Sequence, residues 1–99
     1  NIMAIIKKFT GNTTDTDIVR KHIDKRTVSK VYIACTHDTV DLIVDRLYLD
    51  NGTTEYDIIA NVKVPVGAAV DIPIPMFNYR VYDLKVTTTN SSNCTIIIR

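Results

Sequence analysis

The chain has 99 residues, a length that suits one domain and leaves little room for a second independent core. Hydrophobic residues make up 45% of it and charged residues 23%, a composition typical of a packed globular protein rather than a disordered one. With 12 basic and 11 acidic side chains the formal net charge is +1, which gives no long-range field for a nucleic-acid backbone. We therefore treat 1–99 as a single domain and expect no nucleic-acid partner.

Thirteen threonines and many valines and isoleucines favour β-strands, because β-branched side chains fit a pleated surface better than a helix. The first strand is predicted over Ile2 to Phe9. Its apolar residues precede Lys7 and Lys8, whereas a signal peptide carries its charges first. No apolar run approaches the roughly 20 residues of a membrane span, so we expect a soluble protein without a membrane partner.

The segment 12–26 is ambiguous. Thr14 to Asp17 offers capping residues for a short helix, and apolar residues follow at helical spacing. The threonine-rich, charged composition suits an exposed strand or a long loop equally well. We favour strand or loop over helix for this segment.

The next strand is predicted over Val28 to Cys35, with Val31, Ile33 and Cys35 on its inward face. Behind it follow His37 and Asp38, so a nucleophile, a base and a carboxylate crowd together. Catalytic triads are normally assembled from distant segments inside a cleft. We interpret this run as a strand end followed by a polar turn, and we assign no catalytic residue.

The sequence contains no residue pattern typical of a metal site or a nucleotide site. His22 and His37 are fifteen positions apart, and no pair of cysteines or histidines has ligand spacing. The three glycines are isolated, so no phosphate cradle is expected. Carboxylates at strand ends could bind calcium, but they match no calcium loop, and we interpret them as solvated strand faces: Asp38, Asp41, Asp45 and Asp50. No metal-binding or cofactor-binding residue is assigned.

A hairpin is predicted from 40–49 and 54–64, because Asn51-Gly52 between two apolar runs is a strong turn signal. The apolar residues of 40–49 change parity halfway, so we predict a bulge near Asp45-Arg46. In the second strand, strict alternation predicts one buried face, made of Tyr56, Ile58, Ala60, Val62 and Val64.

The remaining strands follow from the same rule. After the turn Pro65-Val66-Gly67 we expect a short strand over 69–74. It lies at a sheet edge or ends at the prolines, because Pro73 and Pro75 cannot donate to a ladder. The strand 80–88 should point Tyr82, Leu84 and Val86 inward. After a turn at 90–93, Cys94 to Arg99 is the closing strand.

The two cysteines, Cys35 and Cys94, are compatible with one disulfide but too few for a disulfide scaffold. We favour two buried free thiols, which stay reduced if the protein matures inside a cell.

Short strands about ten residues apart, without alternating helices, predict an all-β, antiparallel β-sandwich with seven to eight strands. We expect a jelly-roll-like arrangement. An immunoglobulin domain is disfavoured, because the chain has no tryptophan and Ser92 stands where a tyrosine corner needs Tyr.

Two segments are candidate interfaces. The loop Met76 to Arg80 gathers aromatic and basic residues, and the first strand has an apolar run that is costly to leave in water. The candidate interface residues are Ile2, Ile5, Ile6, Phe9, Met76, Phe77, Tyr79 and Arg80.

Residues 28–99 resemble the small β-sandwich virion proteins of tailed bacteriophages, which decorate or cement capsids or serve as head and tail fittings. The resemblance lies in the order of the strands and in two short patterns, the turn Val64-Pro65-Val66-Gly67 and the strand Leu84-Lys85-Val86. The segments that carry it are 40–44, 58–67, 70–74, 82–86 and the closing 94–99. The first 27 residues depart from that pattern.

The resemblance implies a non-enzymatic virion structural protein that binds or cements a phage capsid or tail assembly. Its implied partners are other virion proteins, such as the major capsid or tail protein, and copies of itself. Its implied location is the virion, assembled in the host cytoplasm, and it implies no catalytic residue or cofactor. The alternative is a carbohydrate- or receptor-binding β-sandwich module whose loop aromatics stack on a surface glycan. The lack of tryptophan favours assembly over sugar binding.

Overall fold

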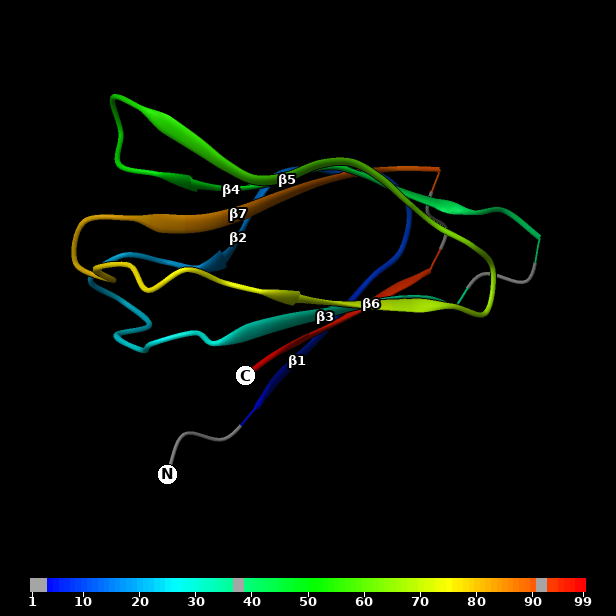
Figure 1. Ribbon diagram of the computed structural model, residues 1–99, viewed down its shortest axis with the longest axis horizontal. Helices are drawn as coiled ribbons and strands as arrows, with labels where there is room; N and C mark the ends of the chain where they lie inside the picture. The colour runs from blue at the N-terminus through cyan, green and yellow to red at the C-terminus, as the bar shows by residue number, and fades with distance from the viewer. Residues whose placement is uncertain (1–3, 37–38, 91–92) are drawn as a thin grey trace.

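The computed structural model describes residues 4–36, 39–90 and 93–99, and these form eight strands in two antiparallel sheets of four (Figure 1). The strands are β1 (Ile5–Phe9), β2 (Thr13–Val19), β3 (Lys30–Cys35), β4 (Leu42–Asp50), β5 (Glu55–Val64), β6 (Ala69–Pro73), β7 (Asp83–Thr89) and β8 (Cys94–Ile98). One sheet has the order β1-β8-β3-β6 and the other β2-β7-β4-β5.

The strand pairing is that of a jelly roll. β4 pairs with β5, β3 with β6, β2 with β7 and β1 with β8, as in one long hairpin. Rolling this hairpin over itself adds the pairings β3 with β8 and β4 with β7, and divides the strands between two packed sheets. The predicted jelly-roll-like sandwich is confirmed.

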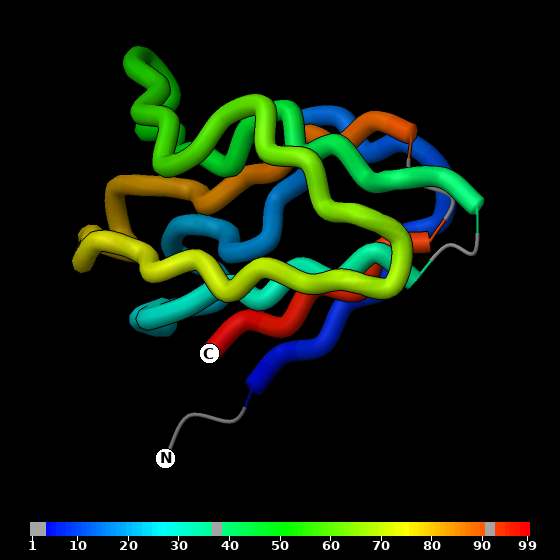
Figure 2. The backbone as a smooth tube through the Cα atoms, turned by 45° about the vertical axis from the view of Figure 1, so that its right-hand side comes forward, coloured from blue at the N-terminus to red at the C-terminus, as the bar shows by residue number. Residues whose placement is uncertain are grey.

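The connections gather at the two ends of the sandwich (Figure 1). The connections after β1, β3, β5 and β7 lie at one end, on the right of the view. The other end, which we call the loop end, carries the three connections 20–29, 51–54 and 74–82. The tube in Figure 2 shows the same separation from a second direction.

The core lies between the sheets and is filled by alternate residues of both. In β3, Val31, Ile33 and Cys35 are buried, as predicted. In β7, Leu84 and Val86 are fully buried, while Tyr82 precedes the strand and packs partly buried against the core. Alternate burial of this kind puts one face of each sheet in the core and leaves the other face to solvent.

The ambiguous segment 12–26 is a strand followed by a loop, which confirms the preferred prediction. β2 spans its first half, and turns follow. The loop is closed locally, because a carboxylate oxygen of Asp24 accepts hydrogen bonds from the backbone N–H and the guanidinium of Arg20.

The β4–β5 hairpin and the bulge in β4 are confirmed. Gly52 adopts a φ of 97°, a conformation that suits glycine best, and the side-chain oxygen of Asn51 accepts hydrogen bonds from the backbone N–H groups of Thr53 and Thr54. Along the β4–β7 pairing the register shifts between Val44 and Arg46, where the parity change predicts it.

The predicted buried face of β5 is wrong at two positions. Tyr56 is 51% exposed and Ala60 is exposed, whereas Val64 is fully buried as expected. Ile58 and Val62 are partly buried and pack against the core. Strict alternation therefore fails over the first half of this strand.

The sequence pattern does not reveal the reason, which is two irregularities in β5. Asn61 adopts a φ of 56°, and beyond it Ala60 faces Arg46 instead of a core residue. Leu47 faces Ile59 but its neighbour Tyr48 faces Asp57, so Ile58 is an extra residue and the parity changes again across it. β5 is also an edge strand, so its side chains are covered on one side only.

The outer strands of the first sheet are β1 and β6. β6 lies at an edge and ends at Pro73, as predicted. β1 completes its own sheet, because Ile5 to Phe9 pair residue by residue with β8, and Ile5 and Phe9 pack against the core. Ile2 lies outside the described residues.

Candidate interaction surface

The loop end carries four large hydrophobic side chains that are exposed. Met76 is 95% exposed, Ile23 62%, Tyr56 51% and Val81 42%. They come from all three connections or the strand residues beside them. Exposed apolar side chains that are scattered singly are ordinary, but several gathered at one end are typical of a contact surface. We call Ile23, Tyr56, Met76 and Val81 the loop-end surface.

Backbone hydrogen bonds fix two of these connections to each other. The N–H of His22 donates to the carbonyl of Tyr79 at 3.2 Å, and the N–H of Ile74 donates to the carbonyl of Ser29 at 2.9 Å. The long loops are thus held by contacts at both of their ends. A surface built on them is preorganised, which lowers the entropic cost of binding.

The hairpin contacts the connection 74–82 through aromatic rings. The rings of Tyr56 and Tyr82 meet edge to face, with centroids 6.1 Å apart and an interplanar angle of 74°. Beside them the guanidinium of Arg80 lies 5.6 Å from the ring centroid of Tyr79. One ring of this end is therefore already covered by a cation from its own chain.

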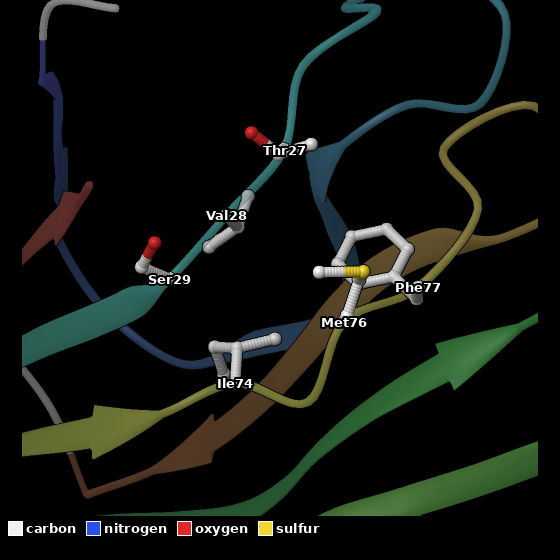
Figure 3. Close-up of a pocket in the computed structure, with 6 residues that line it drawn as sticks. All are labelled: Thr27, Val28, Ser29, Ile74, Met76 and Phe77. Carbon is white, nitrogen blue, oxygen red and sulfur yellow. The ribbon is translucent and has the colours of Figure 1, made fainter.

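A hollow of about 370 Å³ opens between the first and third connections (Figure 3). Val28 and Ile74 are buried, while Met76 is almost fully exposed. Figure 3 shows the lining side chains on two segments, one leading into β3 and one leaving β6. The lining residues are Thr27, Val28, Ser29, Ile74, Met76 and Phe77. Its walls combine apolar side chains with polar atoms, among them two hydroxyl groups, and contain no charged side chain.

A second group of functional side chains covers the outer face of the β2-β7-β4-β5 sheet. The ring of Tyr48 is 1% exposed, because the guanidinium of Arg46 lies 3.7 Å from its centroid. Arg46 also donates to Asp57 at 2.8 and 2.6 Å and to Glu55 at 2.8 Å. These partners raise the pKa of the arginine further, with Glu55 contributing most. The ring is therefore closed to stacking by a ligand.

The hydroxyl of Tyr48 donates to the carboxylate of Asp15 on β2, which links three strands across this face. Burial, followed by this hydrogen bond, raises the pKa of Tyr48, and the same bond is the largest cause that lowers the pKa of Asp15. Further along, Lys85 pairs with Asp50 at 3.0 Å. These charged side chains are paired within the chain, which favours a structural layer over a binding site.

The predicted interface residues fall on two separate parts of the fold. Phe77 and Tyr79 are partly buried, and Met76 and Arg80 are exposed, all at the loop end. The described residues of the first strand lie at the opposite edge of the sheet from β6. There Ile6 is 69% exposed, and the partly buried positions are Ile5 and Phe9. The structure does not bring these two sets together.

Sequence reasoning missed Ile23, Tyr56 and Val81. Ile23 stands in a basic loop and Val81 in an apparent strand, and alternation placed Tyr56 in the core. Their exposure follows from where the strands begin, because β5 and β7 start close to the end of the sandwich. No local pattern in the sequence carries that information.

Four strands form sheet edges, and three of them are interrupted. β2 has two register shifts, β5 has one and also a positive φ at Asn61, and β6 contains Pro73, which has no N–H. Such interruptions protect an edge from pairing with another chain. Among these edges, β1 alone has neither a register shift nor a proline.

The free backbone groups of β1 follow from the pattern of hydrogen bonds. Thr36 N donates to Asn93 O, so the alternate residues of β8, beginning with Cys94, turn their own groups toward β1. The residues of β1 that face them are therefore hydrogen-bonded to β8. Ile6 and Lys8 alternate with those residues, so they direct their N–H and C=O groups away from the sheet.

Of the run Cys35, His37 and Asp38, the structure describes only the cysteine. Cys35 is 2% exposed, and its thiol donates to the carbonyl of Val40 at 3.3 Å. His37 and Asp38 lie outside the described residues. Within 4–36, 39–90 and 93–99, no three His, Cys, Asp or Glu side chains are grouped so that they could hold a metal ion. Over the same residues, no helix has the length and apolar character needed to cross a membrane.

No family model, curated protein or solved structure matches this chain. We therefore argue its function from the fold and surfaces described above.

Proposed function

We propose that the protein is a non-enzymatic structural component of a phage virion, which binds a capsid or tail protein through its loop-end surface. The observation that carries the proposal is the exposure of Met76, at 95%, beside a hollow of about 370 Å³. Methionine adapts its shape and is common at binding surfaces. A partner that covers this end removes apolar area from water, at about 25 cal/mol per Å².

The fold supports the proposal by analogy only. Jelly rolls build viral capsid proteins, lectins and cupins, so the choice among these must come from the site. A sugar platform needs an open aromatic face. Tyr48 is covered by Arg46, and Tyr79 is partly buried beside Arg80, so neither offers one. The apolar side chains of the loop end favour a protein partner.

Contact with copies of itself is the second part of the proposal. The outer edge of β1 is regular, Ile6 is exposed beside it, and strand addition needs such an edge. The ammonium of Lys7, on the inward face, donates to the carbonyl of Asp17 on β2 at 3.4 Å. An inward-pointing lysine on an edge strand normally hinders pairing with another chain. Here the ammonium is already hydrogen-bonded within its own chain, so it does not stand against strand addition at the outer edge.

The test measures whether the protein is incorporated into virus particles. Virus particles from producing cells are banded in a density gradient, and the chain is quantified in the band by mass spectrometry for the wild type and two variants. Met76→Glu places a charge on the loop-end surface. Val66→Glu is the matched control, because Val66 is also exposed, at 38%, but lies at the opposite end.

We expect the wild type and the Val66→Glu variant in the particle band and at least a tenfold loss of the Met76→Glu variant. Absence of the wild-type chain from particles would overturn the virion proposal. Equal recovery of both variants would remove the loop end from it. Binding of the isolated domain on a glycan array, lost on Tyr79→Ala, would favour the carbohydrate-binding alternative instead.

The self-contact is tested by light scattering over a concentration series, with Ile6→Pro, which removes an outward N–H from β1. Concentration-dependent association of the wild type that the variant lacks is the expected result. A wild type that stays monomeric well above micromolar concentrations contradicts this part.

A further inference from the structure

Cys35 and Cys94 lie opposite each other on neighbouring strands. Cys35 ends β3, Cys94 begins β8, and the two are partners in the antiparallel register. Opposed residues in such a pair project from the same side of the sheet. Their exposures are 2% and 0%, so both thiols point into the core.

The hydrogen bonds around the pair identify its type. Thr36 N donates to Asn93 O at 3.2 Å, while the N–H of Cys35 turns to the other neighbour and donates to Ala68 O at 3.0 Å. The two cysteines are thus a non-hydrogen-bonded pair, in which Cα atoms are roughly 4.5 Å apart and side chains come closest. A disulfide accepts Cα separations of about 4.4–6.8 Å. The sheet therefore already holds the two cysteines at a spacing that a disulfide can bridge.

Both thiols are free and buried in the structure. Burial, and then the nearby Cys35, raises the pKa of Cys94 to about 11. Few thiolates exist at neutral pH in such a setting, so exchange with an oxidant is slow. Both residues stand at strand ends beside connecting loops, and local fraying of these ends gives an oxidant access.

We propose that Cys35 and Cys94 are a latent disulfide site, which stays reduced in a reducing cell and closes to an intramolecular disulfide when the protein meets an oxidised low-molecular-weight disulfide. This goes beyond the proposed function and does not depend on it. A structural protein that leaves the cell in which it folds meets that change of redox compartment.

The reaction balances as a thiol–disulfide exchange with glutathione disulfide. One cysteine thiolate attacks a glutathione sulfur, forms a mixed disulfide and releases one glutathione thiolate. The second cysteine thiolate attacks the protein sulfur of that mixed disulfide and releases the second glutathione. The two protein thiols lose two electrons and two protons, and the oxidant is reduced to two glutathione thiols.

The bond would close a loop that runs from residue 35 to residue 94, more than half of the 99-residue chain. In the chain-entropy account a long loop restricts the unfolded state strongly and raises stability. Because the folded register already meets the spacing, little native strain opposes this gain. Closure would tie β3 to β8 at the end of the sheet.

The test incubates the folded wild-type chain with glutathione disulfide, then alkylates it under denaturing conditions and weighs it. We expect a product that has lost two hydrogen atoms, takes up no alkylating reagent, runs as a monomer and unfolds at a temperature higher by about 10 °C or more. Cys35→Ala and Cys94→Ala are the controls. Neither should lose two hydrogen atoms or gain in unfolding temperature in the same buffer.

Three outcomes would overturn the proposal. One is a folded protein that keeps both thiols although the urea-unfolded chain closes in the same buffer. Another is closure that lowers the unfolding temperature, and the third is a covalent dimer as the main product. Each is measured on the isolated chain, so none of them bears on recovery of the protein in virus particles.

Discussion

The two sheets of the sandwich each have four strands but differ in regularity. In β1-β8-β3-β6, which we call the regular sheet, all three pairings run in register over their paired residues. In β2-β7-β4-β5, the bulged sheet, every pairing contains at least one register shift. This difference in register corresponds to a difference in the side chains on the outer faces of the two sheets.

The shifts in the bulged sheet let long polar side chains share the outside while apolar ones stay inside. Because the register moves near Asp45, Leu47 is buried while its neighbours Arg46 and Tyr48 meet on the outer face. The network that they form with Asp15 joins three strands. The regular sheet is stabilised by alternate burial of its side chains. The bulged sheet has, in addition, a layer of hydrogen-bonded polar side chains on its outer face.

The largest expected effect compares isoleucines in the two sheets. Ile33, in the regular sheet, is fully buried, and Ile33→Ala should cost about 2–5 kcal/mol of unfolding free energy by leaving a cavity. Ile58, the extra residue in β5, is only partly buried, so Ile58→Ala should cost roughly half as much or less. Urea unfolding of the two variants measures both. Equal costs would contradict the proposed parity change in β5.

A smaller effect is expected from the polar layer. Tyr48→Phe keeps the buried ring but removes the donor to Asp15, and should cost about 1 kcal/mol, because water can still solvate the exposed carboxylate. Tyr32→Phe, on the half-buried Tyr32 of the regular sheet, is the matched control and should change stability by less than about 0.5 kcal/mol. Urea titrations compare the two. No loss from Tyr48→Phe would mean that this layer does not stabilise the fold.

The same difference between the sheets explains how far sequence reasoning reaches. Alternation located the inward residues of β3, and the parity change in 40–49 located the bulge in β4, because both leave a mark in the order of apolar residues. Ile58-Ile59 leaves no such mark, since two adjacent isoleucines fit either parity. Which of them is extra depends on the partner strand.

The candidate site was predictable only in part, for a similar reason. Met76 to Arg80 stand out as an aromatic and basic loop, whereas Ile23 and Tyr56 join them only because the jelly roll brings three connections to one end. The facing of Cys35 and Cys94 also needs the register, because the two residues lie far apart in the chain. Long-range pairing is the information that local patterns lack.

The smallest expected effect contrasts two carboxylates of β2, an edge strand of the bulged sheet. Burial, and then the nearby Asp83, raises the pKa of Asp17, and its Oδ1 atom is buried without a hydrogen-bond partner among the described residues. A folded pKa above the unfolded value means that the charged form is penalised in the folded state, and the penalty disappears as the pH falls below the ordinary value of 3.8. Asp17→Asn should therefore stabilise the protein at pH 7, by less than about 1 kcal/mol because the side chain is only partly buried. The gain should vanish near pH 3.

Asp15→Asn is the matched control with the opposite sign. The hydrogen bond from Tyr48 lowers the pKa of Asp15, so its charged form stabilises the fold above the ordinary value, and this contribution is lost as the pH falls through the lowered pKa. The substitution should therefore destabilise the protein at pH 7 and matter less in acid. Urea titrations of both variants and the wild type at the two pH values measure the contrast. If both substitutions shifted stability in the same direction at pH 7, the two carboxylates would not differ as their surroundings require.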